Sequence, residues 1–341
     1  MRSLPIVLER QPAIRVALYS HKGGVGKTTL TANIAFALAE MNKNVLLIDS
    51  DPQCSLSSYL LEARRLDALL DASDSEGGET VWSSLRWVRT KLHQPLAPEP
   101  LAISRGLQLL PGDIRMSEFE EELQQYWKET TERRSNGFVG STALSVIANS
   151  ICARSAVDVL FYDCGPNIGP LNRAIMLDCD FFIIPVACDE FSIRAVRTLG
   201  YTLIRWLSQW SDIADLAPDG TYLLPGRPQF LGYVAQQFRV YGGNITQEFG
   251  QFLHRIDRQV REDVVAVLAQ FDPELAPDRG SYEFGEIQNL SSIVAASQRK
   301  HVPVWEVDEG RAEVRDEAKH QFYRMAEQIA KLRVAGRNVN A

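Results

Sequence analysis

Closely spaced cysteines and long apolar runs are both missing from this sequence. Its five cysteines, at positions 54, 152, 164, 179 and 188, form no C-x-x-C pair, which favours a reduced cytosolic protein over a disulfide framework. The opening residues MRSLPIVLERQP contain too short an apolar stretch for a signal peptide, and no membrane-spanning run is visible. The pattern therefore points away from disulfide-rich secreted proteins and from integral membrane proteins.

Positive charge is also scarce. The chain has 36 Lys and Arg residues against 43 Asp and Glu residues, which gives a net charge of −7. An acidic protein is not drawn to nucleic acid as a whole, so any such binding would need a local basic patch. The length of 341 residues would accommodate two domains. Strand and helix patterns alternate along the whole chain, however, which predicts one large α/β domain.

A glycine-rich run, HKGGVGKTT at residues 21–29, is the most informative feature that is present. It joins an apolar, strand-like segment at 14–20 to a segment with helical spacing at 28–40. Its three glycines permit positive φ and close approach to a phosphate, while the helix beginning near Lys27 aims free N–H groups at the anion. The run therefore predicts a phosphate-binding loop, with Lys27 on the β- and γ-phosphates and the Thr28 hydroxyl on Mg²⁺.

An extra lysine sets this loop apart. The common pattern G-x-x-x-x-G-K-[ST] requires glycine where this chain has His21. The run KGGVGKTT instead resembles the deviant loop of the ParA/MinD group of P-loop ATPases. In that group a signature lysine at the position of Lys22 contacts nucleotide phosphates across a dimer interface. The resemblance implies that ATP is bound by Lys22, Gly23, Gly24, Val25, Gly26, Lys27, Thr28 and Thr29.

Two acidic segments follow buried strands in the order that this resemblance implies. NVLLIDSD at 44–51 and VDVLFYD at 157–163 both have buried-strand patterns that end in aspartate. The first is similar to the family's D-x-D-P-Q segment, so Asp51 would orient or polarise the attacking water and Asp49 would lie near the metal. The second is similar to the family's D-C-P-P, so Asp163 would support Mg²⁺ through a bound water. The chain departs from that segment at Gly165 and Asn167, where the family usually has proline and commonly serine.

The resemblance extends over roughly residues 14–333 and implies a P-loop NTPase fold: three layers, α/β/α, around a mostly parallel sheet. Segments at 107–123, 180–196, 230–238 and 287–304 each look like family segments. Gln236 stands where members often carry a polar residue near the adenine, although the proline and arginine of a later I-P-R-N motif are absent. Three stretches, at about 55–105, 212–228 and 240–284, interrupt the similarity and are predicted to be insertions into one domain.

For function, the resemblance implies an ATP-dependent dimerising switch that binds and hydrolyses ATP with Mg²⁺. Turnover would be slow and stimulated by a ParB-like partner or cargo adaptor. The output would be the partitioning or positioning of a cargo, such as plasmid or chromosome DNA or a protein assembly. Lys22, Lys27 and Asp51 would act in catalysis, and the metal set would be Thr28, Asp49, Asp51 and Asp163. The protein would be cytoplasmic and associated with the nucleoid.

Nonspecific DNA binding by the ATP dimer would require clustered basic residues. Three groups are candidates: Arg194, Arg197 and Arg205; Arg255, Arg258 and Arg261; and Arg299, Lys300 and His301. A dimer would double each patch, so contacts that are weak in one subunit would suffice in two.

Two other functions stay open at this point. A MinD-like ATPase that cycles on membranes would insert its last helix, where residues 314–332 carry an apolar stripe. The stripe is modest, so we expect this helix to pack on the core, without stable membrane insertion. A nucleotide-gated assembly factor without affinity for DNA fits the acidic charge and the insertions. An iron–sulfur carrier and a bacterial tyrosine kinase, both related to this group, are disfavoured because C-x-x-C and a C-terminal tyrosine cluster are absent.

Overall fold

The structure is a computed structural model that describes residues 10–90, 97–238, 240–241, 244–245 and 247–334. The predicted absence of a signal peptide concerns residues that are largely outside this set. Short parts of the predicted insertions, at 91–96, 242–243 and neighbouring positions, also lie outside the described residues.

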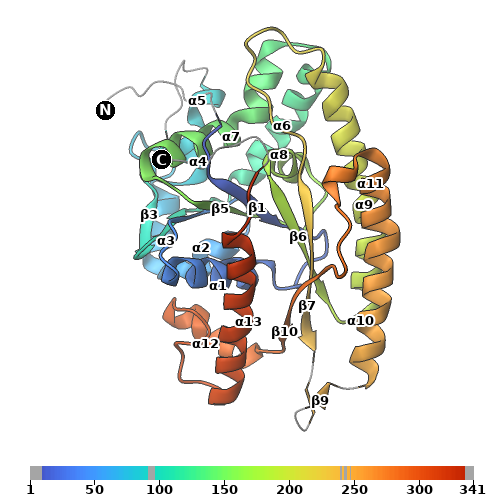
Figure 1. Ribbon diagram of the computed structural model, residues 1–341. Helices are drawn as coiled ribbons and strands as arrows, with labels where there is room; N and C mark the ends of the chain where they lie inside the picture. The colour runs from blue at the N-terminus through green and yellow to red at the C-terminus, as the bar shows by residue number, and fades with distance from the viewer. Residues whose placement is uncertain (1–9, 91–96, 239, 242–243, 246, 335–341) are drawn as a thin grey trace.

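One eight-stranded sheet organises the molecule (Figure 1). All neighbouring strands in it are parallel except β3, which runs antiparallel to β4 at one edge. The order across the sheet is β10 (Glu283–Gln288), β7 (Gln229–Phe238), β6 (Phe181–Ala187), β1 (Ile14–Leu18), β5 (Val159–Asp163), β2 (Val45–Asp49), β4 (Leu107–Leu110) and β3 (Leu101–Ser104). A separate two-stranded hairpin consists of β8 (Val240–Tyr241) and β9 (Asn244–Ile245).

Helices cover both faces of the sheet, because the central strands are apolar on both sides. In β1, Val16 and Leu18 pack into one core while Ala17 packs into the other. The first core is covered by α1 (Lys27–Glu40), α2 (Ser55–Leu60), α3 (Ala63–Asp71), α12 (Ser291–Lys300) and α13 (Ala312–Ala330). The second is covered by α4 (Val81–Ser84), α5 (Arg86–Arg89), α6 (Met116–Thr131), α7 (Ser135–Ser155), α8 (Pro170–Asp178), α9 (Glu190–Ala214), α10 (Gln247–Val260) and α11 (Ala266–Phe271). The predicted three-layer α/β/α fold is therefore confirmed.

The predicted insertions add to these two layers. Residues 55–105 supply α2 and α3 on one face, α4 and α5 on the other, and the edge strand β3. Residues 247–275 supply α10, the π-helix η1 (Arg261–Val265), α11 and the 3-10 helix η2 (Pro273–Leu275), whose apolar side chains join the second core. We therefore propose that the chain is one domain in which these segments are elaborations.

The π-helix η1 approaches α9 unusually closely. A Cβ atom added to Gly200 of α9 would lie 1.8 Å from the Asp263 carbonyl oxygen of η1. Only glycine leaves the space for this contact between two helix backbones. The late insertion thus packs closely against α9 because η1 has the wider turn of a π-helix and because residue 200 has no side chain.

The last helix, α13, packs beside α1, so helices from opposite ends of the sequence are neighbours (Figure 1). Phe322, Met325, Ala326 and Ile329 of its apolar stripe are fully buried. This confirms the expectation that the helix packs on the core. In the described part of the chain, we find no helix with the length and apolarity that crossing a bilayer demands.

A buried ionic cluster lies near the start of β1. The Arg15 guanidinium is completely buried and binds Asp178, Ser145 and Asn149. Arg10 pairs with Asp178 and Asp180. Burial acts to raise the pKa of the Asp178 carboxyl, but Arg15 and Arg10 hold that pKa well below its ordinary value. The cluster therefore balances its charges internally.

Candidate nucleotide site

Three parallel strands bring the predicted site residues to one edge of the sheet. The register pairs Leu18 of β1 with Asp163 of β5, and Asp163 with Asp49 of β2. The loop at 19–26 leaves β1 at this edge and leads into α1. Ligands of open α/β sheets bind at the carboxyl ends of the strands, and this edge is formed by such ends.

The loop backbone has the geometry of an anion cradle. Gly24 and Gly26 adopt positive φ of 71° and 76°, whereas Gly23 does not, so only two of the three predicted glycines use that freedom. Gly26 is the N-cap residue of α1 and offers no side chain to the first turn. The first N–H groups of α1 are therefore available for a phosphate.

Gln236 of β7 holds this loop in place. Its side-chain amide is buried and donates to the Val25 carbonyl oxygen. A Cβ atom at Gly26 would lie 2.4 Å from its Oε1, so glycine at 26 is needed for this contact as well as for the turn. The structure thus places Gln236 against the phosphate loop, and its predicted role at the adenine stays a prediction.

Thr28 and Asp163 form a pair behind the loop. The Thr28 hydroxyl donates to Asp163 Oδ2 at 2.8 Å, while Asp163 Oδ1 is buried without a hydrogen-bond partner among the described residues. Mg²⁺ is commonly held by one or two protein oxygens together with phosphates and waters. A hydroxyl beside a carboxylate with one free oxygen fits such an ion, and Lys27, which is buried in the same loop, supplies a cation toward a phosphate.

Asp49 and Asp51 lie next to this pair but have different contacts. Asp49 Oδ2 accepts hydrogen bonds from the Ser57 backbone N–H at 2.8 Å and from its hydroxyl at 2.7 Å, which ties β2 to α2. Asp51 Oδ1 accepts from the Gln53 N–H at 2.9 Å. Asp49 is therefore engaged inside the protein, and Asp51 is the more open of the two.

Buried like charges raise carboxyl pKa values at this edge. Burial first, and then the neighbouring aspartates, raise the pKa of Asp49 and of Asp163 above the ordinary range. A divalent cation would offset this repulsion. No three His, Cys, Asp or Glu side chains of the described residues converge into a ready metal site, so phosphate and water oxygens would have to complete the coordination.

Lys22 points away from the loop and toward the start of α9. Its ammonium group binds the Asp189 carboxylate and lies 3.0 Å from the Ser192 hydroxyl. Asp189 is also the N-cap of α9, because its Oδ1 accepts from the Ser192 N–H at 2.9 Å. Burial acts to raise the pKa of Asp189, but these hydrogen bonds keep it below the ordinary value. Within its own subunit, Lys22 is thus held by α9.

The loop after β5, which we call the switch loop (residues 165–169), is fixed by Asn167. Asn167 Oδ1 accepts from the Gly169 N–H at 3.1 Å and from Asn172 Nδ2 at 2.7 Å. The Tyr19 hydroxyl donates to the Asn167 carbonyl at 3.0 Å, which links the switch loop to the start of the phosphate loop. The side chain that departs from the family pattern therefore organises this loop.

Sequence reasoning missed two acids at this site. Asp189 was detectable, since Asp three residues before Ser192 at the start of a helical run is a capping pattern. Glu120 of α6 had no local signal, because its partner Asn167 is 47 residues away in the sequence.

Comparison with known proteins identifies the family. A family model described as an AAA domain matches residues 14–210, which is more than half of the chain. The chromosome partitioning protein ParA of Caulobacter vibrioides is 30% identical over 200 residues. The chain belongs to the ParA/MinD family of P-loop ATPases. The sporulation initiation inhibitor protein Soj of Bacillus subtilis is 26% identical over 191 residues.

These matches cover only part of each protein. They span 58% and 54% of this chain, and 65% and 62% of ParA and Soj respectively, so the chain matches less than two thirds of each relative. Among solved structures, a Corynebacterium diphtheriae protein aligns with a TM-score of 0.67 at 24% identity, covering 84% of this chain and 97% of its own.

Two further structures share the ParA/MinD fold. Apo McdA of Cyanothece has a TM-score of 0.59 at 15% identity and covers 93% of this chain and 98% of its own. The pNOB8 ParA bound to nonspecific DNA has a TM-score of 0.54 at 19% identity and covers 94% and 98%. At these identities the likeness establishes the fold.

In this ParA/MinD-type protein, several of the predicted basic side chains are neutralised by ion pairs with nearby carboxylates. Arg255 binds Glu190 through two nitrogens at 2.5 and 2.7 Å. Arg261 pairs with Asp257 at 2.7 Å. The third group is also neutralised, since Arg299 pairs with Glu309 at 3.3 Å and Lys300 with Asp308 at 3.0 Å.

The α9 arginines differ from these. Arg194 and Arg205 are exposed and make no ion pair with a described residue. Arg197 faces the charge of Asp263 on η1. Of the three predicted groups, the one on α9 therefore retains the most unpaired positive charge among the described residues.

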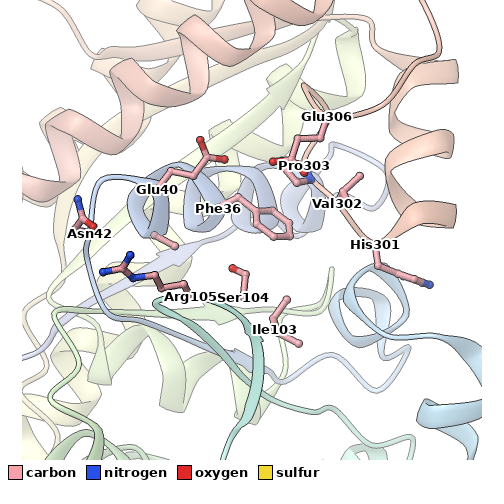
Figure 2. A pocket seen from close by; sticks show the side chains of 11 residues that line it. Phe36, Glu40, Asn42, Ile103, Ser104, Arg105, His301, Val302, Pro303 and Glu306 are labelled. Carbon is pink, nitrogen blue, oxygen red and sulfur yellow. The ribbon is translucent and has the colours of Figure 1, made fainter.

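A pocket of about 400 Å³ lies at the other end of α1 (Figure 2). It lies between the end of α1, the β3–β4 turn and the segment after α12, with Glu40 and Arg105 among its lining residues. Glu40 already accepts from the Trp305 indole N–H at 3.0 Å. Helix α1 has 14 residues and rises about 1.5 Å per residue. The pocket and the phosphate loop therefore lie at opposite ends of this helix.

Proposed function

We propose that this protein is an ATP-dependent dimerising switch of ParA type, which binds and hydrolyses ATP with Mg²⁺ to partition or position a cargo. The observation that carries the proposal is the contrast between the two loop lysines. Lys27 is buried in the cradle beside the Thr28–Asp163 pair, whereas Lys22 extends out of it to Asp189. A lysine whose side chain extends out of its own phosphate loop would be able to reach the phosphates bound by a partner subunit.

In the proposed reaction, the loop N–H groups and Lys27 would bind the phosphates, and Thr28 and Asp163 would hold Mg²⁺. The cation would neutralise charge on the transferred phosphoryl group. Lys22 from the second subunit adds positive charge that favours the transition state. Asp51 places the attacking water. Hydrolysis then releases Lys22 and dissolves the dimer.

Exposed apolar residues at the same edge support a dimer. Phe191 at the start of α9 is 71% exposed, Ile114 after β4 is 59% exposed, and Ile168 in the switch loop is 47% exposed. All three follow the carboxyl ends of sheet strands, where the phosphate loop also lies. Large exposed apolar side chains around a charged site are typical of an interface.

We propose that the ATP dimer binds DNA without sequence preference through α9. This binding would take place in the cytoplasm, over the nucleoid. A partner protein would stimulate ATP turnover. A family member of the same fold was solved with nonspecific DNA. The acidic net charge means that two copies of the α9 face are needed together.

DNA binding by the ATP-bound protein across a salt series tests this function. We expect binding that needs ATP, falls steeply with salt, and is lost in Lys22→Ala but kept in the control Lys43→Ala. Binding without ATP, or none at low salt, would refute the DNA role. Asp51→Ala should trap an ATP dimer with hydrolysis lost, and a variant that turns over normally would refute the role of Asp51.

One observation favours a second candidate, a nucleotide-gated assembly factor that does not bind DNA. Carboxylates neutralise much of the basic charge on α10 and α12. In that case the ATP dimer would form normally but ignore DNA even at low salt. Sedimentation with and without ATP, run beside the DNA experiment, separates the two functions.

A further inference from the structure

Glu120 of α6 contacts the switch loop from outside the nucleotide site. Its Oε2 accepts a hydrogen bond from Asn167 Nδ2 at 3.4 Å. A Cβ atom at Gly169 would lie 1.8 Å from its Oε1, so a side chain at 169 would displace this carboxylate. The acid is therefore built into the turn that joins the switch loop to α8.

The Glu120 carboxylate also serves the N-terminus of α8. The N-cap of that helix is Gly169, which has no side chain to bind the first N–H groups. Burial raises the pKa of the Glu120 carboxyl, while the Asn167 amide and the Leu171 N–H act to lower it. Oε1 is buried and has no hydrogen-bond partner among the described residues. One acceptor is thus free to tighten on the first turn of α8.

A second residue of α6 holds the same turn. Trp127 lies seven positions after Glu120, on the same face of the helix, and its indole N–H donates to the Pro170 carbonyl at 3.2 Å. The Arg173 guanidinium stacks over the Trp127 ring at 4.1 Å. Helix α6 therefore contacts the start of α8 through two residues, Glu120 and Trp127. Of these two, Glu120 also contacts the switch loop.

The switch loop approaches Glu120 at Asn167 and Gly169. At its start, a Cβ atom at Gly165 would lie 3.4 Å from Asp51 Oδ1. The charge of Asp51 is felt at Glu120. A shift of the loop that lengthens the Asn167–Glu120 bond would thus alter the space in front of Asp51.

We propose that Glu120 is a positioning residue for ATP hydrolysis: through Asn167 and the first turn of α8 it sets the switch loop against Asp51. The proposal rests on the proposed function. Glu120 does not touch the nucleotide, so its removal affects the rate of the chemical step and leaves ATP binding nearly intact.

Steady-state kinetics of the full chain tests this with Glu120→Ala and Glu120→Gln. We expect Glu120→Ala to lower kcat about ten-fold with KM for ATP within about two-fold, because a charge-assisted hydrogen bond is lost. Glu120→Gln keeps an acceptor and should retain most of kcat. The matched control is Glu121→Ala, one position along the helix and exposed. Unchanged kcat in Glu120→Ala, or a rise in KM alone, would overturn the proposal.

A residue exchange keeps the test decisive if Glu120→Ala fails to fold. Asn167→Asp retains the oxygen that accepts from Gly169 but turns a second carboxylate oxygen toward Glu120, so kcat should fall. Adding Glu120→Gln to Asn167→Asp restores an amide opposite an acid and should recover most of the loss. Additive losses in the double variant would show that the two side chains do not act together.

Amide hydrogen exchange of the nucleotide-free protein separates this inference from the function itself. If the wild type hydrolyses no ATP, the proposed function fails. Glu120→Ala should still speed exchange at residues 167–173 by about ten-fold, relative to Glu121→Ala. Equal exchange in the two variants would overturn the positioning role whatever the protein hydrolyses.

Discussion

Two groups of buried aspartates at opposite edges of the same sheet have opposite electrostatics. Asp178 is enclosed by Arg15 and Arg10, and its pKa is well below the ordinary range. Asp49 and Asp163 are equally buried, but they face other aspartates, and their pKa values are raised. The first group balances its charge with the protein's own cations. The second group consists of like charges with Lys27 as a neighbouring cation, and it is where we propose that Mg²⁺ binds.

Asp178→Asn would break the balanced cluster and should have the largest effect. Removing this carboxylate leaves the buried Arg15 guanidinium without its ion-pair partner and Arg10 with Asp180 alone, so we expect the free energy of unfolding to fall by about 3–5 kcal/mol. Chemical denaturation followed by circular dichroism measures it. The control Asp215→Asn changes an exposed acid at the end of α9 and should stay within about 0.5 kcal/mol. A loss equal to that control would mean that the cluster contributes little.

Acid should reveal the same contribution. A carboxyl whose pKa is lowered by folding stabilises the protein above its unfolded pKa, near 4, and the stabilisation is lost as the pH falls below that value. Because its pKa in the folded protein lies below pH 3, we expect Asp178 to account for about 1 kcal/mol of the stability lost between pH 7 and pH 3, with the rest lost at still lower pH. Comparing denaturation of the wild type and Asp178→Asn from pH 7 to pH 3 isolates it. Parallel pH curves would contradict the assignment.

Asp163→Asn, the same change at the other edge, should have the opposite sign. A carboxyl whose pKa is raised by folding costs stability above its unfolded pKa, so removing it should raise the free energy of unfolding at pH 7 by about 1 kcal/mol. Added Mg²⁺ and ATP should stabilise the wild type but not this variant. A lower free energy of unfolding in the nucleotide-free variant would contradict the predicted difference between the two groups of aspartates.

Asp189→Asn should have the smallest effect on stability. Asparagine still caps α9, whereas the partly exposed ion pair with Lys22 is lost, which changes the unfolding free energy by less than about 1 kcal/mol. Lys22 is then free to leave its subunit, so the ATP concentration for half-dimerisation should fall about two- to five-fold. Light scattering against ATP concentration measures the midpoint. An unchanged midpoint would show that Asp189 does not restrain Lys22.

Much of the fold was predictable, because the strands at 14–18, 45–49 and 159–163 are continuous apolar runs that end in loop signals. Helix α7 gave no comparable signal: nearly all of SNGFVGSTALSVIAN is buried, so small residues replace an amphipathic stripe. The edge strand β3 is only four residues long. The helical segment from Gln247 to Phe271 is interrupted by a π-helix, which helical spacing alone does not disclose.

The site was predictable where chemistry is local in sequence. The loop lysines, Thr28 and the strand-end aspartates all lie at one edge, as their positions after strands imply. The partners of Lys22 and Asn167 come from α9 and α6, and only the fold brings them close. The predicted basic groups are partly paired for the same reason, because Glu190 reaches Arg255 from another helix.

The contact between Gly200 and η1 also has an evolutionary consequence. Because the Asp263 carbonyl occupies the place of a side chain at 200, we expect the late insertion and this glycine to be inherited together. A relative that loses the insertion is free to replace the glycine, and one that gains a different insertion needs a different solution on α9. Covariation between position 200 and the presence of the π-helix would trace when this lineage acquired its extra segment.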